Sequence, residues 1–259
     1  MFSEKFEQEK SAFINPDTFL KRIDKLPKTC VGFFSKKLLS EFITQYSPSI
    51  VTNLNSAPLA FDVYEVTMNN SKIAVFNALI GAPACAMQVE ELFAVGVENL
   101  LLVGCCGCLD EKLADFSIIV PTSAIRDEGT SFHYAPPTQE IKLDSKIVTL
   151  IKNFFSNKNI PYNTGKTWTT DAFFRETATK IANAKKVGAI TVEMECASIA
   201  TIAKFRNKNF GQIFYGADDL SCENYDERSV VKDDNVNKKN NILNLALECA
   251  ETIDVQIND

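Results

Sequence analysis

The stretch GAPACAMQVEELFAVGVENLLLVGCCG, residues 81–107, decides the fold class of this chain. Residues 84–97 are amphipathic at helical spacing, with Leu92 on the apolar side. LLLVG at 100–104 follows as a short, fully apolar run, which suits a strand buried on both faces of a sheet. GCCG at 104–107 then predicts a tight turn of small residues. A helix followed at once by a buried strand indicates an α/β protein.

The same two patterns alternate outward from this stretch. Strands are predicted at 29–34, 61–66, 72–78, 116–121, 190–195 and 212–218, and helices at 16–25, 36–46, 144–157, 196–206 and 238–256. The polar residues between the second and third of these strands predict a hairpin, and Pro48 and Pro58 bracket a stretch predicted to be irregular. We see no internal repeat or low-complexity linker. The sequence therefore predicts an N-terminal extension at 1–28 and one α/β domain at 29–259, with a mixed or mainly parallel sheet.

Composition narrows the function classes. The chain has 259 residues, of which 46% are hydrophobic, so it can bury a sizeable core. With 27 Lys and Arg against 33 Asp and Glu, the formal net charge is −6, which disfavours nucleic-acid binding. No apolar run approaches the ~18 residues of a membrane span. Because the N-terminal MFSEKFEQEK also lacks an apolar signal core, we expect a cytoplasmic protein.

Cysteine and histidine usage limits the chemistry. The chain has 8 cysteines and 1 histidine, His133, and a chain of this length without a signal peptide predicts reduced thiols. Cys105, Cys106 and Cys108 cluster, but no second CxxC or HxxxH accompanies them, so we expect no metal. A Ser-His-Asp triad would depend on His133 alone, without a GxSxG motif, and is disfavoured.

Five segments that could carry chemistry follow predicted strands. In open α/β sheets, ligands bind beyond the carboxyl ends of strands, so these segments are predicted to share one region. They are GCCG (104–107), RDEGTSFHYAPP (126–137), TTDAFF (169–174), VEMEC (192–196) and GADDLS (216–221).

VEMEC offers two carboxylates two residues apart. On a strand, Glu193 and Glu195 would share one face, where they would accept hydrogen bonds from a pair of sugar hydroxyls, and Met194 would face the other way. The alternative is a solvated strand face, which the apolar neighbours disfavour. Met194 fits either the core or a contact with a ring.

The remaining segments each allow two interpretations. Asp218 or Asp219, in a pocket, would have its pKa raised by burial and serve as a general acid; otherwise they cap a helix or form a turn. The backbone amides of GCCG would cradle an anion, or its small residues only allow the chain to turn. FHY at 132–134 and FF at 173–174 would stack on a planar ligand, or form a satellite core or an oligomer interface.

Taken in this order, the segments resemble the nucleoside phosphorylase superfamily, which holds purine nucleoside phosphorylases, uridine phosphorylases and related nucleosidases. The most specific pieces are 81–107, 126–137 and VEMECASIATIA at 192–203, and GADDLSCENYDER at 216–228 looks like a uridine-phosphorylase-like branch. The likeness runs from about Thr29 to the C-terminal helix.

The resemblance implies a fold and a reaction. The fold is a central mixed sheet that forms a distorted barrel flanked by helices. The assembly is a homodimer or hexamer, with sites near a subunit interface. The reaction is attack of phosphate on C1′ of a ribonucleoside, which gives ribose 1-phosphate and a free base, with no metal or organic cofactor. The partners implied are therefore a small nucleoside and phosphate.

Residue by residue, the resemblance assigns roles around the sugar and the base. Glu195 matches the carboxylate that binds the ribose 2′ and 3′ hydroxyls, and Met194 matches the residue that packs beside the sugar. Phe173 matches an aromatic ring near the base, and Asp219 matches the acid that protonates a purine. The turn that holds phosphate is matched by Gly104, Cys105 and Gly107.

The phosphate end departs from the family pattern. Leu102 stands where an arginine is usual, and VGFFSKKL replaces the Gly-Asp-Pro-x-Arg motif. Lys36 or Lys37 lies near the position of that motif's arginine, and we assign Lys37 to phosphate. Lysine supplies charge but not a bidentate fork. Cys105 replaces the usual Ser or Thr and is a weaker hydrogen-bond donor.

The base end departs as well. The GQxR signature of uridine phosphorylases is missing, with Thr177 and Thr179 at its Gln and Arg positions. We expect Arg175 and Thr170 to contact the base instead. His133 lies in FHYAPP, where a structural role is as well supported as a catalytic one.

Three functions follow from these observations. The first is a nucleoside phosphorylase, a pentosyltransferase for purine or pyrimidine ribonucleosides. The second is a nucleosidase that uses water, which the missing arginines favour. The third is a non-catalytic nucleoside-binding protein that kept the fold, which the presence of both Glu195 and Asp219 disfavours. The fold alone does not distinguish the three.

Overall fold

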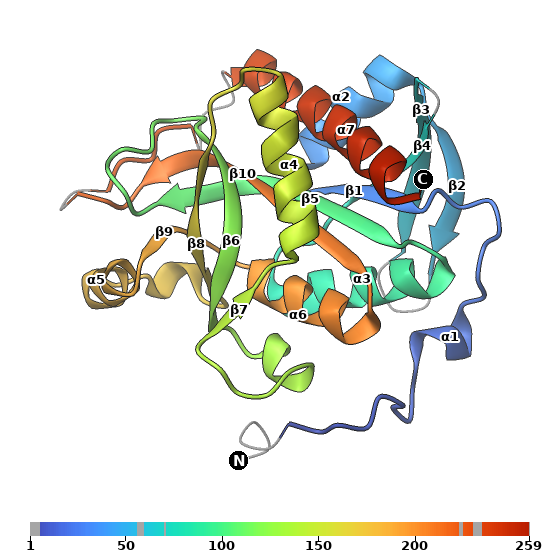
Figure 1. The fold of residues 1–259 in the computed structure, drawn as a ribbon, viewed down its shortest axis with the longest axis horizontal. Coiled ribbons are helices and arrows are strands. Elements are labelled where there is room, and N and C mark those ends of the chain that lie inside the picture. Colours follow the sequence, from blue (N-terminus) through green and yellow to red (C-terminus); the bar gives the residue numbers. More distant parts are fainter. Residues whose placement is uncertain (1–5, 56–59, 70, 223–224, 230–234, 259) are drawn as a thin grey trace.

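The apolar run at 100–104 belongs to β5 (Asn99–Cys108), which lies in the middle of the sheet in the computed structural model (Figure 1). The structure describes residues 6–55, 60–69, 71–222, 225–229 and 235–258. All but one residue of β5 are buried, as expected for a strand with neighbours on both edges and helices on both faces.

The described strands form one mixed sheet in the order β10-β6-β8-β9-β5-β1-β4-β3-β2, with β7 paired to β6. Because β10 also pairs with β5, five strands (β5, β9, β8, β6 and β10) close into a ring. The predicted fold class, an α/β protein whose mixed sheet forms a barrel flanked by helices, is therefore confirmed. The other strands are β1 (Thr29–Phe33), β2 (Ser49–Leu54), β3 (Phe61–Met68), β4 (Ser71–Asn77), β6 (Ile118–Asp127), β7 (Glu140–Lys142), β8 (Asn163–Thr170), β9 (Ala189–Glu193) and β10 (Asn209–Asp219).

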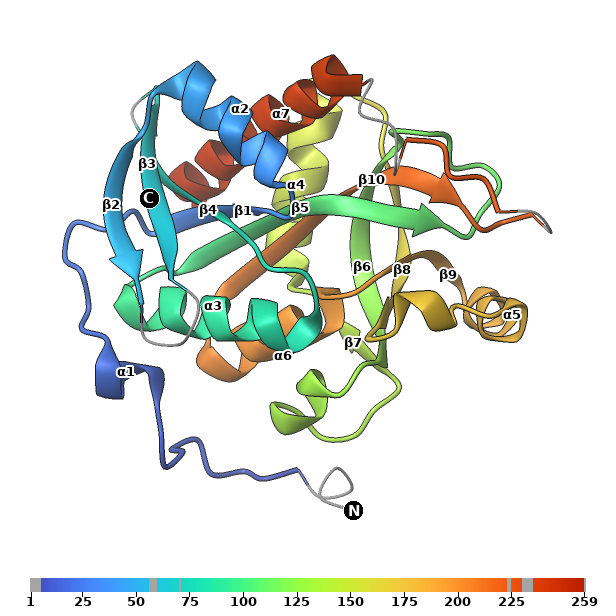
Figure 2. The same cartoon turned by 180° about the vertical axis from the view of Figure 1, so that it is seen from behind.

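Helices cover both sides of this sheet (Figures 1 and 2). Helices α3 and α6 lie together on one side, and α2, α4 and α7 lie on the other. The segment before β1 runs along the outside and contacts α3 through α1. No helix in the described ranges combines the length and the apolar character needed to cross a membrane. The helices are α1 (Pro16–Phe19), α2 (Lys36–Tyr46), α3 (Ala82–Val95), α4 (Ser145–Asn157), α5 (Ala178–Lys186), α6 (Cys196–Arg206) and α7 (Val236–Asn258), with short η2 (Thr130–His133) and η3 (Phe173–Arg175).

Several predicted elements differ from the structure. α1 is four residues long and not a helix over 16–25, and β2 lies inside the stretch predicted to be irregular. β8 and α5 were not predicted. β8 reads NTGKTWTT, which lacks an apolar run, yet its last four residues are buried because it pairs with both β6 and β9. Tertiary pairing has here overridden local propensity.

The largest correction concerns GCCG at 104–107, which is not a turn. β5 continues through it to Cys108, in parallel register with β10 up to Asp219. The glycines allow close packing instead of a reversal of the chain. A Cβ on Gly107 would lie 2.6 Å from the side chain of Leu220, and one on Gly104 would lie 2.8 Å from the Phe34 ring.

A ladder of polar side chains joins the first residues of three parallel strands. The amide of Asn209 donates to Asn99 at 2.7 Å, and the amide of Asn99 donates to the hydroxyl of Thr29 at 2.9 Å. That hydroxyl donates in turn to Asp254 on α7 at 2.6 Å. Thr29 and Asn99 are buried, and the three strand residues are register partners across β1, β5 and β10. We call this group the polar ladder.

Candidate active site

A cavity of about 660 Å³ opens at the carboxyl ends of β5, β9 and β10. We call it the central cavity. It is bounded by four of the five segments singled out in the sequence, because the barrel brings these strand ends together. Its lining residues are Phe34, Ile80, Gly104, Cys105, Cys106, Gly107, Asp171, Ala172, Phe173, Phe174, Arg175, Glu176, Val192, Glu193, Met194, Glu195, Gln212, Phe214 and Asp218.

The junction between β9 and α6 positions the two glutamates differently from the prediction. β9 ends at Glu193, and Glu195 is the N-cap residue of α6 with φ −135° and ψ −30°, so the two do not share a strand face. Glu193 accepts hydrogen bonds from the backbone N–H groups of Glu195 and Cys196 at 2.8 and 2.7 Å, and from Thr169 at 2.5 Å. Its carboxylate therefore holds the junction and is not free to bind a sugar, although it lines the cavity.

The carboxylate of Glu195 also lines this wall and is oriented by the backbone. Oε1 accepts a hydrogen bond from the backbone N–H of Gly81 at the start of α3. Gly81 has φ 96°, which residues with a side chain rarely adopt. Burial, together with the charge of Glu193, raises the pKa of Glu195 to about 8. Burial likewise raises the pKa of Glu193 to about 7, against the hydrogen bonds that it accepts.

A β-bulge near the end of β10 directly precedes Asp218 and Asp219. Gly216 pairs with Cys106 and Asp218 with Gly107, so Ala217 is the extra residue. Asp218 lines the central cavity, and burial raises its pKa against a hydrogen bond from the Tyr225 hydroxyl. Gly107 is required by close packing beside this aspartate, because a Cβ there would lie 2.6 Å from Leu220 and 2.8 Å from Val192.

Asp219, which is predicted to act on the base, is not among the residues that line the central cavity. Its carboxylate accepts hydrogen bonds from the backbone N–H of Ser221 at 2.8 Å and from the guanidinium of Arg228. Burial alone would raise the pKa of Asp219, but these hydrogen bonds and the charge of Arg228 hold it below its ordinary value. Asp219 thus fixes the strand end, and Asp218 is the aspartate in the cavity.

The aromatic and apolar wall matches the prediction in part. Phe173, Arg175 and Met194 all line the central cavity. The Phe173 and Phe174 rings meet edge to face, 5.0 Å apart, at the cavity mouth. Thr170 is buried, and its hydroxyl accepts a hydrogen bond from the N–H of Ala172 at 3.3 Å, so it shapes the turn and does not reach the cavity.

The end of the cavity predicted to hold phosphate has an unusual wall. The ladder between β5 and β1 ends at Val103, and the ladder with β9 begins at Gly107, so residues 104–106 face the gap between those two strands. The Phe34 ring packs against Gly104. Cys105 is the exposed residue of β5, but the cavity walls desolvate its thiol, and this desolvation, together with the charge of Asp218, raises the pKa of the thiol to about 11, so the thiol is protonated at neutral pH. The predicted Lys37 lies exposed on the first turn of α2 and does not line the cavity.

His133 also lies away from the central cavity. It is an exposed residue of η2 and lines a separate hollow between α3 and the N-terminal segment. The FHYAPP segment is therefore not part of the cavity. Its arginine neighbour, Arg126, is buried and donates to Ser131 at 2.8 Å and to the carbonyl of Pro136 at 2.7 Å, which fixes the loop.

Sequence reasoning missed Glu176, which lies directly after η3 and lines the central cavity. Burial, together with the charge of Asp218, raises the pKa of Glu176 to about 7. The signal available was its position two residues beyond the FF pair. In the part of the chain that is described, no group of three or more His, Cys, Asp or Glu side chains is placed to hold a metal ion.

A family model and several known proteins match parts of this chain. A family model described as the phosphorylase superfamily matches residues 34–251. Guanosine phosphorylase of Halorubrum lacusprofundi is 26% identical over 153 residues, which is 59% of this chain and 64% of that protein. Uridine phosphorylase of Haemophilus influenzae is 28% identical over 107 residues, 41% of this chain and 42% of that protein. The chain thus spans less than two thirds of the length of these relatives.

A solved structure supports the fold over a longer range. The AMP nucleosidase from Bacteroides thetaiotaomicron superposes with a TM-score of 0.73 and covers 90% of this chain and 91% of its own. The two are 20% identical, so the likeness concerns the fold alone.

Proposed function

Because this chain belongs to the phosphorylase superfamily, we propose that it cleaves the N-glycosidic bond of a purine ribonucleoside with phosphate. The products are free base and ribose 1-phosphate, and no organic cofactor takes part. The observation that carries the proposal is that Glu195 and Asp218 line one cavity, from two different strand ends. They supply an acceptor for the sugar and an acid for the leaving base.

Glu195 is proposed to bind the ribose 2′ and 3′ hydroxyls. The backbone N–H of Gly81 holds one of its oxygens, so the carboxylate is oriented before the substrate arrives. Glu193 fixes the backbone of Glu195 from behind. As the glycosidic bond breaks, positive charge develops on the ribose ring, and an ionised carboxylate close to it in a dry cavity stabilises that charge. Met194 packs beside the sugar.

Asp218 is proposed to donate a proton or hydrogen bond to the leaving purine. Burial raises its pKa, which increases the fraction that carries a proton. The departing base gains electron density at its ring nitrogens and leaves more readily when one of them is protonated. Phe173, with Phe174 at its edge, offers a ring face for the planar base.

Phosphate is proposed to enter at the backbone of Gly104, Cys105 and Gly107. Residues 104–106 face the gap between β1 and β9, so the backbone N–H groups on that edge are the donors offered to an anion. Support also comes from the guanosine and uridine phosphorylases among the relatives.

Hydrolysis is the second candidate function. The lining of the central cavity includes four acidic side chains besides Asp171, and Arg175 is its one guanidinium among the described residues. A carboxylate such as Glu176, with a pKa of about 7, is suited to take a proton from water. This observation favours water over phosphate as the attacking group.

A chromatographic assay for free base separates the candidates. Uridine, inosine, adenosine and methylthioadenosine are each offered with and without phosphate, with Glu195→Ala as the inactive control. Base released only with phosphate, together with ribose 1-phosphate, supports the proposal. Equal release without phosphate replaces it with hydrolysis. Saturable binding without release replaces it with a nucleoside-binding protein. Sedimentation of the same sample tests the expected homo-oligomer.

A further inference from the structure

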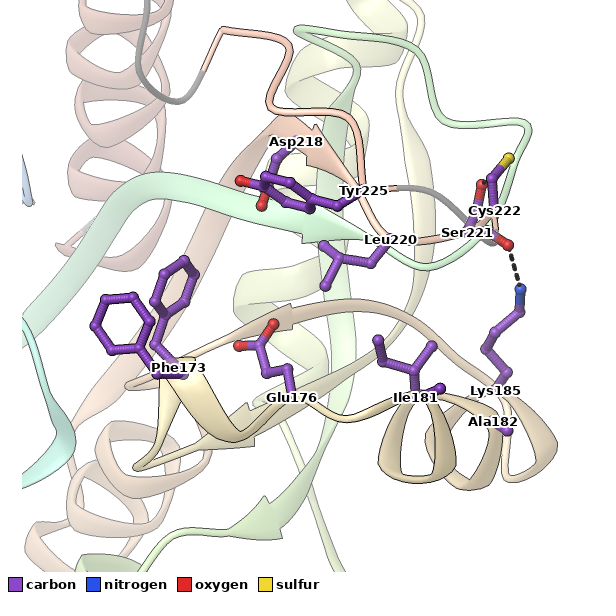
Figure 3. A pocket seen from close by; sticks show the side chains of 12 residues that line it. Phe173, Glu176, Ile181, Ala182, Lys185, Asp218, Leu220, Ser221, Cys222 and Tyr225 are labelled. Carbon is purple, nitrogen blue, oxygen red and sulfur yellow. Dashed lines mark hydrogen bonds between the residues drawn. The ribbon is translucent and has the colours of Figure 1, made fainter.

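A second cavity of about 910 Å³, drawn in Figure 3, adjoins the central cavity and does not include Glu195 in its lining. We call it the side chamber. The two share Phe173, Phe174, Glu176 and Asp218, so a ligand in one can extend into the other. The central cavity is already large enough for a small ligand, since ligand sites commonly measure roughly 300–1,000 Å³. The side chamber is therefore additional space that a plain nucleoside does not need.

The entrance to the side chamber is lined by hydrogen-bond acceptors. In Figure 3, the Glu176 carboxylate points up into the space, and Asp218 lies beside the Tyr225 ring above it. Asp218 accepts a hydrogen bond from Tyr225, and its charge contributes to the raised pKa of Glu176. Two carboxylates facing one space repel each other when ionised. A ligand that brings an N–H group between them relieves that repulsion.

Beyond the entrance, the side chamber is mainly apolar. Ile181 and Ala182 of α5 form one wall, and Leu220 projects from the opposite side (Figure 3). Ala178 of α5 also lines the chamber. At the far end, the ammonium of Lys185 donates a hydrogen bond to the carbonyl of Ser221 at 3.1 Å. An apolar group of limited length would fit between the acidic entrance and this hydrogen bond.

We propose that the side chamber binds an apolar substituent carried on an exocyclic amino group of a purine. The juxtaposition of acceptors at the entrance and an apolar wall behind them matches a secondary amine that bears an alkyl or aryl group. The inference rests on the proposed function, because it takes the base to lie against Asp218. If Asp218 contacts N7 of a purine, the 6-amino group is its neighbour on the same edge and points toward Glu176.

Binding of free bases tests this inference without requiring turnover. Calorimetry compares adenine with N6-benzyladenine, and 6-benzyloxypurine serves as the matched ligand that keeps the benzyl group but lacks the N–H. We expect N6-benzyladenine to bind at least about tenfold more tightly than adenine, because its ring leaves water. We expect 6-benzyloxypurine to lose about half an order of magnitude or more of that gain, because the acceptors are left without a donor.

The matched protein variants are Ala182→Trp and Asn183→Trp. Both residues are exposed on α5, but only Ala182 lines the side chamber, so only the first variant fills it. Ala182→Trp is expected to abolish the tenfold gain and to leave adenine binding within about twofold. Asn183→Trp is expected to keep the gain. Thermal unfolding of both variants checks that they are folded.

The outcomes distinguish this inference from the proposed function. N6-benzyladenine that binds no better than adenine, or a gain that survives Ala182→Trp, overturns the inference alone. A gain removed by Ala182→Trp, in a protein that releases no base from any nucleoside, supports the side chamber and overturns the proposed reaction. Failure of all three bases to bind overturns both.

Discussion

The two ends of the central cavity differ in how their polar groups are held. At the end proposed to bind the sugar and the base, Glu195 and Asp218 come from a helix start and a bulged strand, and the surrounding protein fixes both. At the end predicted for phosphate, the wall is β-strand backbone, a protonated thiol and the ring of Phe34. Lys37, the cation expected there, lies outside the cavity lining.

This difference shows which end of the cavity depends on particular side chains. The first end offers buried carboxylates whose neighbours orient them, so substitutions there act directly on the bond that breaks. The second end offers backbone groups, which no side-chain substitution removes. We therefore expect effects on turnover to be large at the first end and small at the second.

Loss of Glu195 has the largest expected effect. We expect Glu195→Ala to lower kcat/KM by about 10²–10³, because the ribose hydroxyls lose their acceptor and the developing positive charge loses its carboxylate. Steady-state release of base measures it, with Glu111→Ala, at an acidic residue outside the cavity lining, as the control. A loss below tenfold would remove Glu195 from the sugar site.

The two aspartates provide the next test. We expect Asp218→Asn to lower kcat by about 10–10² while leaving the melting temperature nearly unchanged. Asp219→Asn breaks the ion pair with Arg228 and is expected to lower stability by about 1–3 kcal/mol with a smaller effect on kcat. Comparing kcat with thermal unfolding for both variants checks the assignment. The reverse pattern would restore Asp219 as the acid.

The raised pKa values of the buried glutamates predict a pH-dependent stability. The pKa of Glu195 is about 8 in the folded chain against an ordinary value of 4.5, so the folded state holds the proton more tightly. Its contribution is full below about pH 4.5 and is lost as the pH rises through about 8. Glu195→Gln is therefore expected to stabilise the protein by roughly 3 kcal/mol more at pH 9 than at pH 5.5. Denaturant unfolding of both proteins at the two pH values measures this, and an equal change at both pH values contradicts it.

The phosphate end provides the smallest expected changes. We expect Cys105→Ser to lower the KM for phosphate by about two- to fivefold, because a hydroxyl is a better donor than a thiol. Lys37→Ala is expected to change that KM by less than about twofold, since Lys37 does not line the cavity. Initial rates at varied phosphate concentration measure both. A tenfold rise in KM for Lys37→Ala would return the lysine to the site.

The sequence was sufficient to predict a helix or strand where one local pattern dominated the segment. β5 was predicted from its apolar run, the hairpin of β3 and β4 from the polar residues between them, and α4 from its helical spacing. β8 could not be predicted, because its threonines are buried by strands 24 or more residues away in the chain.

In the site, the sequence predicted the segments but not the directions of their side chains. Asp218 and Asp219 are adjacent, and only the bulge at Ala217 determines which of them faces the cavity. Glu193 and Glu195 were expected on one strand face, but the chain begins α6 between them. Such local irregularities depend on the neighbouring strand and leave no trace in periodicity.

The polar ladder bears on how accurately the chain assembles. Thr29, Asn99 and Asn209 meet at the ends of β1, β5 and β10 opposite the cavity, where they satisfy one another only when the three strands are aligned. A slip of one residue would leave buried polar groups unpaired and would displace Asp218 along Gly107 by about 3.3 Å. The unpaired groups of the polar ladder would therefore destabilise a mispaired folding intermediate. The same slip would displace the residues of the proposed site at the carboxyl ends of the strands.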